Sequence, residues 1–212
     1  MTPMKTIYEK KAHTVIQNMK KRQINGYYAA TSAEAIAIAN KLLTGAKTVS
    51  FGGSMTLEES GMLAALRTNE TITLLDRSTA ASAEEAAAIY HDALQTDAYF
   101  MSSNAITQQG ELINIDGNGN RVAALIYGPK KVIILAGMNK VCPNTEEAMS
   151  RVHNLATPAN CIRLKKQTPC SVTGFCSDCL SPDCICNQFV ITRRSGDPAR
   201  LHVILIGESL GY

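Results

Sequence analysis

Apolar residues follow two different patterns along this 212-residue chain. Over residues 4–25 they recur at near-helical spacing, from Ile7 to Ile24, and Gly26 follows as a stop signal. Short and nearly continuous apolar runs of strand length occupy 47–51, 72–75, 98–102 and 131–136. Such runs are typical of strands covered on both faces. The sequence therefore predicts a leading helix within residues 1–26, followed by a mainly parallel sheet.

Three later helices are indicated by a hydroxyl residue followed three positions on by glutamate. These pairs are Thr31 with Glu34, Thr56 with Glu59, and Ser82 with Glu85. In such a capping box the hydroxyl accepts a hydrogen bond from a free amide of the first helical turn, while the glutamate accepts one from the amide of the cap residue. Helices alternating with apolar strands predict a three-layer α/β/α domain.

The last third of the chain adds a helix, a cysteine-rich segment and two strands. The helix is predicted from Asn144 to about Leu164, with an interruption near Pro158. The cysteine-rich residues 165–188 read as an insertion before the last strands, QFVITRR and RLHVILIG, which we expect to pair around the turn SGDPA. The whole chain, 1–212, is predicted to form one domain.

The amino-acid composition and charge exclude several classes of protein. Hydrophobic residues make up 45% and charged residues 18%, which is a globular balance. A net charge of +3 is too small to predict nucleic-acid binding. No apolar run approaches the roughly 18 residues of a membrane span, and the N-terminus is polar rather than signal-like. We therefore expect a cytoplasmic protein whose cysteines are kept as thiols.

Two glycine-containing loops lie between a predicted strand and a predicted helix: the first loop is 52–56 and the second loop is 116–121. Their backbone amides and small polar side chains suit an anion, because glycine allows close approach and a helix start has free N–H donors. The alternative is that both are tight structural turns. A third strand end follows at SSNAI, and all three strand ends are expected at one crevice of the sheet. The candidate ligand-binding residues are Gly52, Gly53, Ser54, Met55, Thr56, Ser103, Asn104, Asp116, Gly117, Asn118, Gly119, Asn120 and Arg121.

These loops also carry a family resemblance. FGGSMTLEESG, NAITQQGELINIDGNGNRVAALIYGPKKVIILAGMNK and the closing VILIGESLGY resemble the LUD (lactate utilisation) domain family from about Ser32 onward. That resemblance implies a fold of the NagB/RpiA/CoA-transferase-like type with an anion-binding crevice. It also implies an accessory or electron-transfer role in lactate-type organic-acid metabolism, with a protein partner in an oxidation complex.

No catalytic residue can be assigned from the sequence. The four histidines are scattered, and Glu111 and Asp116 around the second loop are as consistent with turn stabilisation as with acid–base work. A free-standing isomerase or CoA-transferase-like enzyme and a regulatory or scaffold subunit therefore stay open as alternatives. A homo-oligomer is compatible with each of them.

The segment TPCSVTGFCSDCLSPDCICN holds five cysteines. Cys170, Cys176, Cys179 and Cys186 are expected to bind a metal, because two cysteines separated by two residues form a chelating arm that flanking thiols can complete. Zinc would stabilise a segment with little apolar surface, whereas an Fe–S cluster would fit the lactate-oxidation setting. The alternative is free thiols on a loop, and Cys184 is a surplus ligand candidate.

Overall fold

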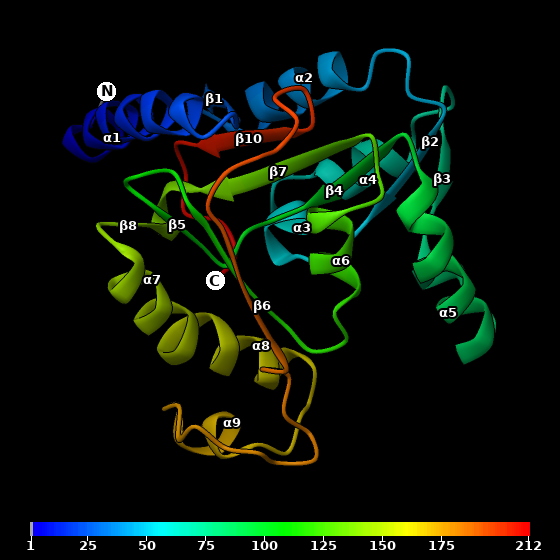
Figure 1. The fold of residues 1–212 in the computed structure, drawn as a ribbon, viewed down its shortest axis with the longest axis vertical. Coiled ribbons are helices and arrows are strands. Elements are labelled where there is room, and N and C mark those ends of the chain that lie inside the picture. The colour runs from blue at the N-terminus through cyan, green and yellow to red at the C-terminus, as the bar shows by residue number, and fades with distance from the viewer. Residues whose placement is uncertain (1) are drawn as a thin grey trace.

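A six-stranded parallel sheet lies between two layers of helices in the computed structural model, which describes residues 2–212 (Figure 1). Its strands, in spatial order, are β1 (Asn25–Ala29), β10 (Leu201–Ile206), β7 (Lys131–Gly137), β4 (Ala98–Met101), β2 (Thr48–Phe51) and β3 (Thr73–Leu75). Every neighbouring pair in this sheet is parallel. The predicted three-layer α/β/α fold is confirmed.

Side chains of each central strand alternate between two hydrophobic cores. In β7, Ile134 belongs to one core, whereas Ile133 and Leu135 belong to the other. The first core is covered by α1 (Pro3–Lys21) and α6 (Asn120–Ile126), and the second by α2 (Ser32–Leu42), α3 (Met55–Glu59) and α4 (Met62–Arg67). Each fully buried side chain of this size stabilises the fold by about 1.5–3 kcal/mol. Because successive residues of a strand point to opposite faces and both faces are buried here, successive positions are apolar.

Two of the three predicted helix starts are confirmed. Thr31 caps α2 and Ser82 caps α5 (Ala83–Asp92), each by accepting a hydrogen bond from the amide three residues on. The third start was wrong, because Ser54 rather than Thr56 caps α3. Thr56 is fully buried, and its hydroxyl donates to the Leu210 carbonyl at 3.2 Å.

The ends of the chain pair differently from the sequence prediction. The leading helix stops at Lys21, and the chain then forms β1, a strand that the sequence analysis missed. The two last strands were expected to pair with each other, but they belong to different sheets. LHVILI of β10 is buried at every position and lies between β1 and β7, whereas QFVIT of β9 (Gln188–Thr192) is mostly exposed and lies at a sheet edge.

A second, four-stranded sheet packs beside the first and contains β9. Its order is β8 (Val141–Cys142), β5 (Ala105–Thr107), β6 (Leu112–Asp116) and β9. The predicted helix 144–164 covers this sheet as α7 (Thr145–Arg151), a π-helical turn at Val152–Ala156 and α8 (Thr157–Arg163). The interruption precedes Pro158, which has no N–H for the regular helical ladder. The shorter elements are η1 (Arg77–Thr79), η2 (Ala93–Gln95), η3 (Met138–Lys140) and α9 (Pro169–Thr173).

Among residues 2–212, no helix combines the length and the apolar character that a membrane crossing requires.

Candidate functional site

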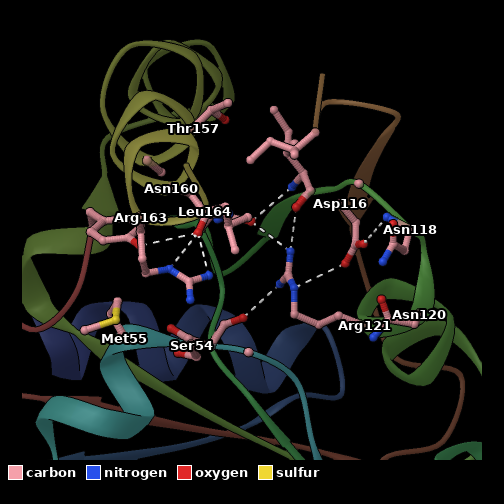
Figure 2. Close-up of a pocket in the computed structure, with 18 of the residues that line it drawn as sticks. Ser54, Met55, Asp116, Asn118, Asn120, Arg121, Thr157, Asn160, Arg163 and Leu164 are labelled. Carbon is pink, nitrogen blue, oxygen red and sulfur yellow. Dashed lines mark hydrogen bonds and ion pairs between the residues drawn. The ribbon is translucent and has the colours of Figure 1, made fainter. Parts of the chain in front are cut away.

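A pocket of about 370 Å³ lies where the carboxyl ends of β2, β4 and β7 face the second sheet and α8 (Figure 2). Ten of the thirteen candidate ligand-binding residues line it: Gly53, Ser54, Met55, Ser103, Asn104, Asp116, Gly117, Asn118, Asn120 and Arg121. The first loop and the second loop therefore face one cavity, although more than 60 residues separate Ser54 from Asn118.

Three candidate residues do not line the pocket. A Cβ on Gly52 would lie 2.9 Å from the Arg121 Cγ and 3.0 Å from the Tyr99 hydroxyl, so this glycine allows close packing inside the protein. Thr56 is buried beneath the first loop, and Gly119 adopts a left-handed backbone (φ +84°) at the start of α6. These three residues shape the loops without facing the cavity.

The second loop follows a strand of a different sheet from the one predicted. It follows β6, which is antiparallel to both of its neighbours in the second sheet, and not a strand of the parallel sheet. Asp116 Oδ1 accepts hydrogen bonds from the amides of Asn118 (3.1 Å) and Gly119 (2.8 Å). Because these amides are engaged by Asp116, the loop presents mainly side chains to the cavity. Asp116 thus stabilises its turn, and Glu111 lies outside the pocket and pairs with Arg22 at 3.0 Å.

Arg121 organises the wall of the pocket. Its Nη1 donates to the Ser102 carbonyl (3.0 Å) and to Asn114 Oδ1 (2.5 Å). Its Nη2 donates to Asn104 Oδ1 (3.0 Å) and to the Ile115 carbonyl (2.6 Å), while Nε pairs with Asp116 Oδ2 at 3.3 Å. A guanidinium has five N–H donors, so all of them are engaged within the protein. Figure 2 shows this side chain between the second loop and the first.

Four further basic residues line the pocket but were not among the candidates predicted from the sequence: Arg77, Lys140, Arg163 and Lys166. Asp116 is the only Asp or Glu side chain among the residues that line it, and Asp116 is paired with Arg121. Lys166 is 3.5 Å from Asp183, which leaves Arg77, Lys140 and Arg163 as the cations without a carboxylate partner in the described part of the chain. The pocket is therefore strongly electropositive. No local motif marks this set, because Arg77, Lys140 and the pair Arg163 and Lys166 come from three separate parts of the chain.

Arg77 from η1 and Arg163 from α8 both line the cavity. The Arg77 guanidinium bonds the Tyr90 hydroxyl and lies 5.3 Å from the centre of that ring. Arg163 donates through Nε (3.1 Å) and Nη2 (2.7 Å) to Asn160 Oδ1, and its side chain is exposed. Both guanidinium groups can thus donate to an oxyanion while being held in position by a neighbouring side chain.

Lys140 lies on the floor of the pocket at the end of β7. It is 4% exposed, and its Nζ donates to Ser102 Oγ at 3.1 Å. Burial lowers the pKa of this amine to about 7, and the positive charges of Arg151 and Arg121 act in the same direction. The charge of Glu59 opposes them.

The four expected metal ligands are dispersed. Cys170 is buried with its Sγ 3.7 Å from the Sγ of Cys161, whereas Cys176 has its Sγ 3.4 Å from His153 Nδ1. Cys186 bonds through its amide to the Sγ of Cys184 at 3.3 Å, and Cys179 makes no such contact. Within residues 2–212, no group of three or more His, Cys, Asp or Glu side chains is placed to hold a metal ion. The donor set as arranged does not fit the predicted tetrahedral site.

The cysteine-rich segment is attached to the pocket rather than separate from it. Ile185 lines the cavity, and the Asn187 side chain donates to the Gly117 carbonyl at 2.8 Å. Asp183 accepts from the Gln167 amide at 2.8 Å, which closes the segment on itself. The segment therefore contacts the second loop and helps to hold its backbone in position.

The burial of the individual cysteines predicts the order in which their thiols are alkylated. Burial raises the pKa of Cys161 to about 11 and that of Cys186 to about 12, so both are protonated thiols at neutral pH. Cys176 and Cys179 are less buried than Cys161 and Cys170. We expect iodoacetamide at pH 8 to modify Cys176 and Cys179 first and Cys161 and Cys170 last, as measured by peptide mass spectrometry over time. Equal rates for all four in the native protein, with the urea-unfolded protein as control, would show that this packing is wrong.

The sequence matches the family model of the LUD domain over residues 12–206. The structure is similar to that of a DUF162 family protein from Deinococcus radiodurans, at 16% identity and a TM-score of 0.56, covering 94% of this chain and 98% of that one. At this identity the similarity shows the fold alone.

Two weaker structural similarities have TM-scores too low to carry an argument. One is to eIF2B delta from Chaetomium thermophilum, at 19% identity and a TM-score of 0.33, covering 57% of this chain and 51% of that one. The other is to ribose 5-phosphate isomerase from Plasmodium falciparum, at 14% identity and a TM-score of 0.30, covering 61% and 68%. No curated protein matches the sequence.

Proposed function

The chain belongs to the LUD domain family, and from that premise we propose that its pocket binds a small anionic metabolite within an accessory component of lactate-type organic-acid metabolism. The observation that carries this proposal is the charge of the cavity. Arg77 and Arg163 line it as cations without a carboxylate partner in the described residues, Lys140 adds a partial positive charge at neutral pH, and the only acidic side chain of the lining is paired with Arg121. Unpaired cations in a partly enclosed site attract an anion strongly, because the site screens charge less than water does.

The size and polarity of the cavity favour a small ligand. A volume of about 370 Å³ is at the lower end of the range for small-molecule sites. Hydroxyl and amide side chains from Ser54, Asn118 and Asn160 surround the cations and can orient a carboxylate or phosphate. These residues come from both loops and from α8, so one bound anion would contact three separate elements.

Carboxylate-based isomerase chemistry receives less support from the same residues. The Asp116 carboxylate is engaged by two amides and by Arg121, and Glu111 lies outside the pocket. A pair of free carboxylates for proton transfer is therefore not placed among the lining residues.

A protein partner is proposed at the cysteine-rich segment. Val172, Phe175 and Leu180 are 82%, 73% and 100% exposed there. Three large apolar side chains this exposed within nine residues of sequence favour an interaction site. They favour a partner in an oxidation complex or a second copy of this chain at that end of the molecule.

Binding of an anion can be tested by thermal and chemical unfolding. We expect lactate, pyruvate or inorganic phosphate to stabilise the protein by about 2.7 kcal/mol at a concentration of one hundred times Kd. Lactamide is the matched neutral control for lactate, and sodium chloride at equal ionic strength controls for general salt effects. Stabilisation by lactamide equal to that by lactate, or no response to any of the three anions, would refute the proposal.

A further inference from the structure

A buried lysine without an acidic partner lies at the floor of the pocket. Lys140 is the last residue of η3, which follows β7 directly, and it lines the cavity with its Nζ beside Ser102 Oγ. Among residues 2–212, no carboxylate oxygen lies within 4.0 Å of this nitrogen. A buried ammonium without a partner is costly, so a lysine with only a structural role would be expected to have a carboxylate or carbonyl acceptor.

The charges around Lys140 favour its neutral amine. The positive charges of Arg121 and Arg151 both act on Lys140. Arg151 is held in place because it donates to the carbonyls of Asn104 (2.6 Å) and Asn139 (3.2 Å). The nearest acidic influence is Glu59, whose carboxylate accepts a hydrogen bond from the Gly211 amide at 2.6 Å. Burial and a neighbouring cation are the two means by which proteins activate a lysine as a nucleophile.

A hydroxyl relay begins at the same nitrogen. Lys140 Nζ donates to Ser102 Oγ (3.1 Å), and Ser102 Oγ lies 3.3 Å from Thr56 Oγ1 and can donate to it. Ser102 also lines the cavity. A hydroxyl that can both accept and donate is suited to carry a proton between the lysine and a bound carbonyl group.

We propose that Lys140 forms an imine with an aldehyde or ketone that carries a carboxylate or phosphate, and that Arg77 and Arg163 hold the anionic group. This inference rests on the proposed anion-binding function and narrows the ligand to an anionic carbonyl compound. The neutral nitrogen attacks the carbonyl carbon, so that a C–N bond forms, the C=O π bond breaks and the carbonyl oxygen takes up one proton from solvent. The nitrogen then gives one of its two protons to that oxygen, which leaves as water, and a protonated imine remains. The step consumes one solvent proton, and nothing is oxidised or reduced.

Reductive trapping tests the imine. Pyridoxal 5′-phosphate is the probe, because it joins an aldehyde to a phosphate, and sodium cyanoborohydride converts its imine to a stable amine. At pH 7 about half of Lys140 is neutral, against fewer than about one in a thousand of an exposed lysine with an ordinary pKa. We expect one adduct per chain, located at Lys140 by peptide mass spectrometry, with a rate that rises with pH and levels off above about pH 8.

Matched variants separate this proposal from unspecific labelling. Lys140→Met should lose the adduct and keep its stability, because methionine fills the same volume without a buried charge. Lys130→Met, at a lysine whose side chain is 80% exposed, should keep the adduct. Pyruvate or inorganic phosphate should slow the labelling of Lys140. If Lys130 is labelled faster than Lys140, so that the labelling rate follows solvent exposure, the proposal is overturned.

The outcome also distinguishes this inference from the proposed function. If lactate, pyruvate or phosphate stabilises the wild type and Lys140→Met alike while no adduct forms at Lys140, the anion pocket stands and the imine is refuted. If no anion stabilises the protein and no adduct forms, both are refuted. Unfolding of Lys140→Met at a clearly lower urea concentration would show that Lys140 has a structural role instead.

Discussion

Replacement of Arg121 by alanine is expected to lower the free energy of unfolding by about 3–5 kcal/mol, the largest stability effect that the structure predicts for a single residue of the pocket. All five donors of this guanidinium are engaged, and its side chain is 12% exposed. Alanine would leave Asp116 without its cation and two backbone carbonyls without their donor. Urea unfolding at pH 7 measures the effect through the midpoint and the slope.

Two control variants identify the cause of this loss. Arg121→Lys keeps the positive charge but has no planar fork, so it should be intermediate between the wild type and Arg121→Ala. Arg163→Ala removes an exposed arginine of the same pocket and should change the free energy of unfolding by less than about 0.5 kcal/mol. If Arg121→Ala unfolds at the wild-type midpoint, the network around this residue is not formed in solution.

Removal of both Arg77 and Arg163 is expected to weaken anion binding by about a hundredfold or more. A hydrogen bond to a charged group contributes about 1.5–3 kcal/mol, and both guanidinium groups line the cavity. Stability without ligand should change little, because Arg163 is exposed, Arg77 is half-buried, and neither forms an ion pair among residues 2–212. Isothermal titration with whichever anion stabilises the wild type gives the two dissociation constants.

Arg193 and Arg194 provide a matched control for this double variant. They line a separate surface hollow with Lys21 and Arg22, away from the proposed site. Arg193→Ala combined with Arg194→Ala removes the same formal charge from the protein and should leave the dissociation constant unchanged. An equal loss of affinity in both double variants would mean that net charge, and not the pocket, attracts the anion.

The sequence alone determined the layered fold and most of its helices and strands. Continuous apolar runs such as KVIILA identified strands covered on both faces, because burial on two sides requires apolar side chains at successive positions. Thr31 and Ser82 identified helix starts, since a cap depends on residues only three positions apart. The two loops around Ser54 and Asn118 were also recognisable from their glycines.

Only the tertiary structure decided which strands are neighbours and which side chains face the ligand cavity. The insertion of β10 between β1 and β7 joins segments about 175 residues apart along the chain, and no local pattern records that pairing. The engagement of Arg121, the isolation of Lys140 and the dispersal of the cysteines likewise depend on long-range contacts. Local patterns report the conformation and burial of a residue because these depend on its near neighbours in the chain. Whether a charge is paired depends on the atoms that folding brings beside it.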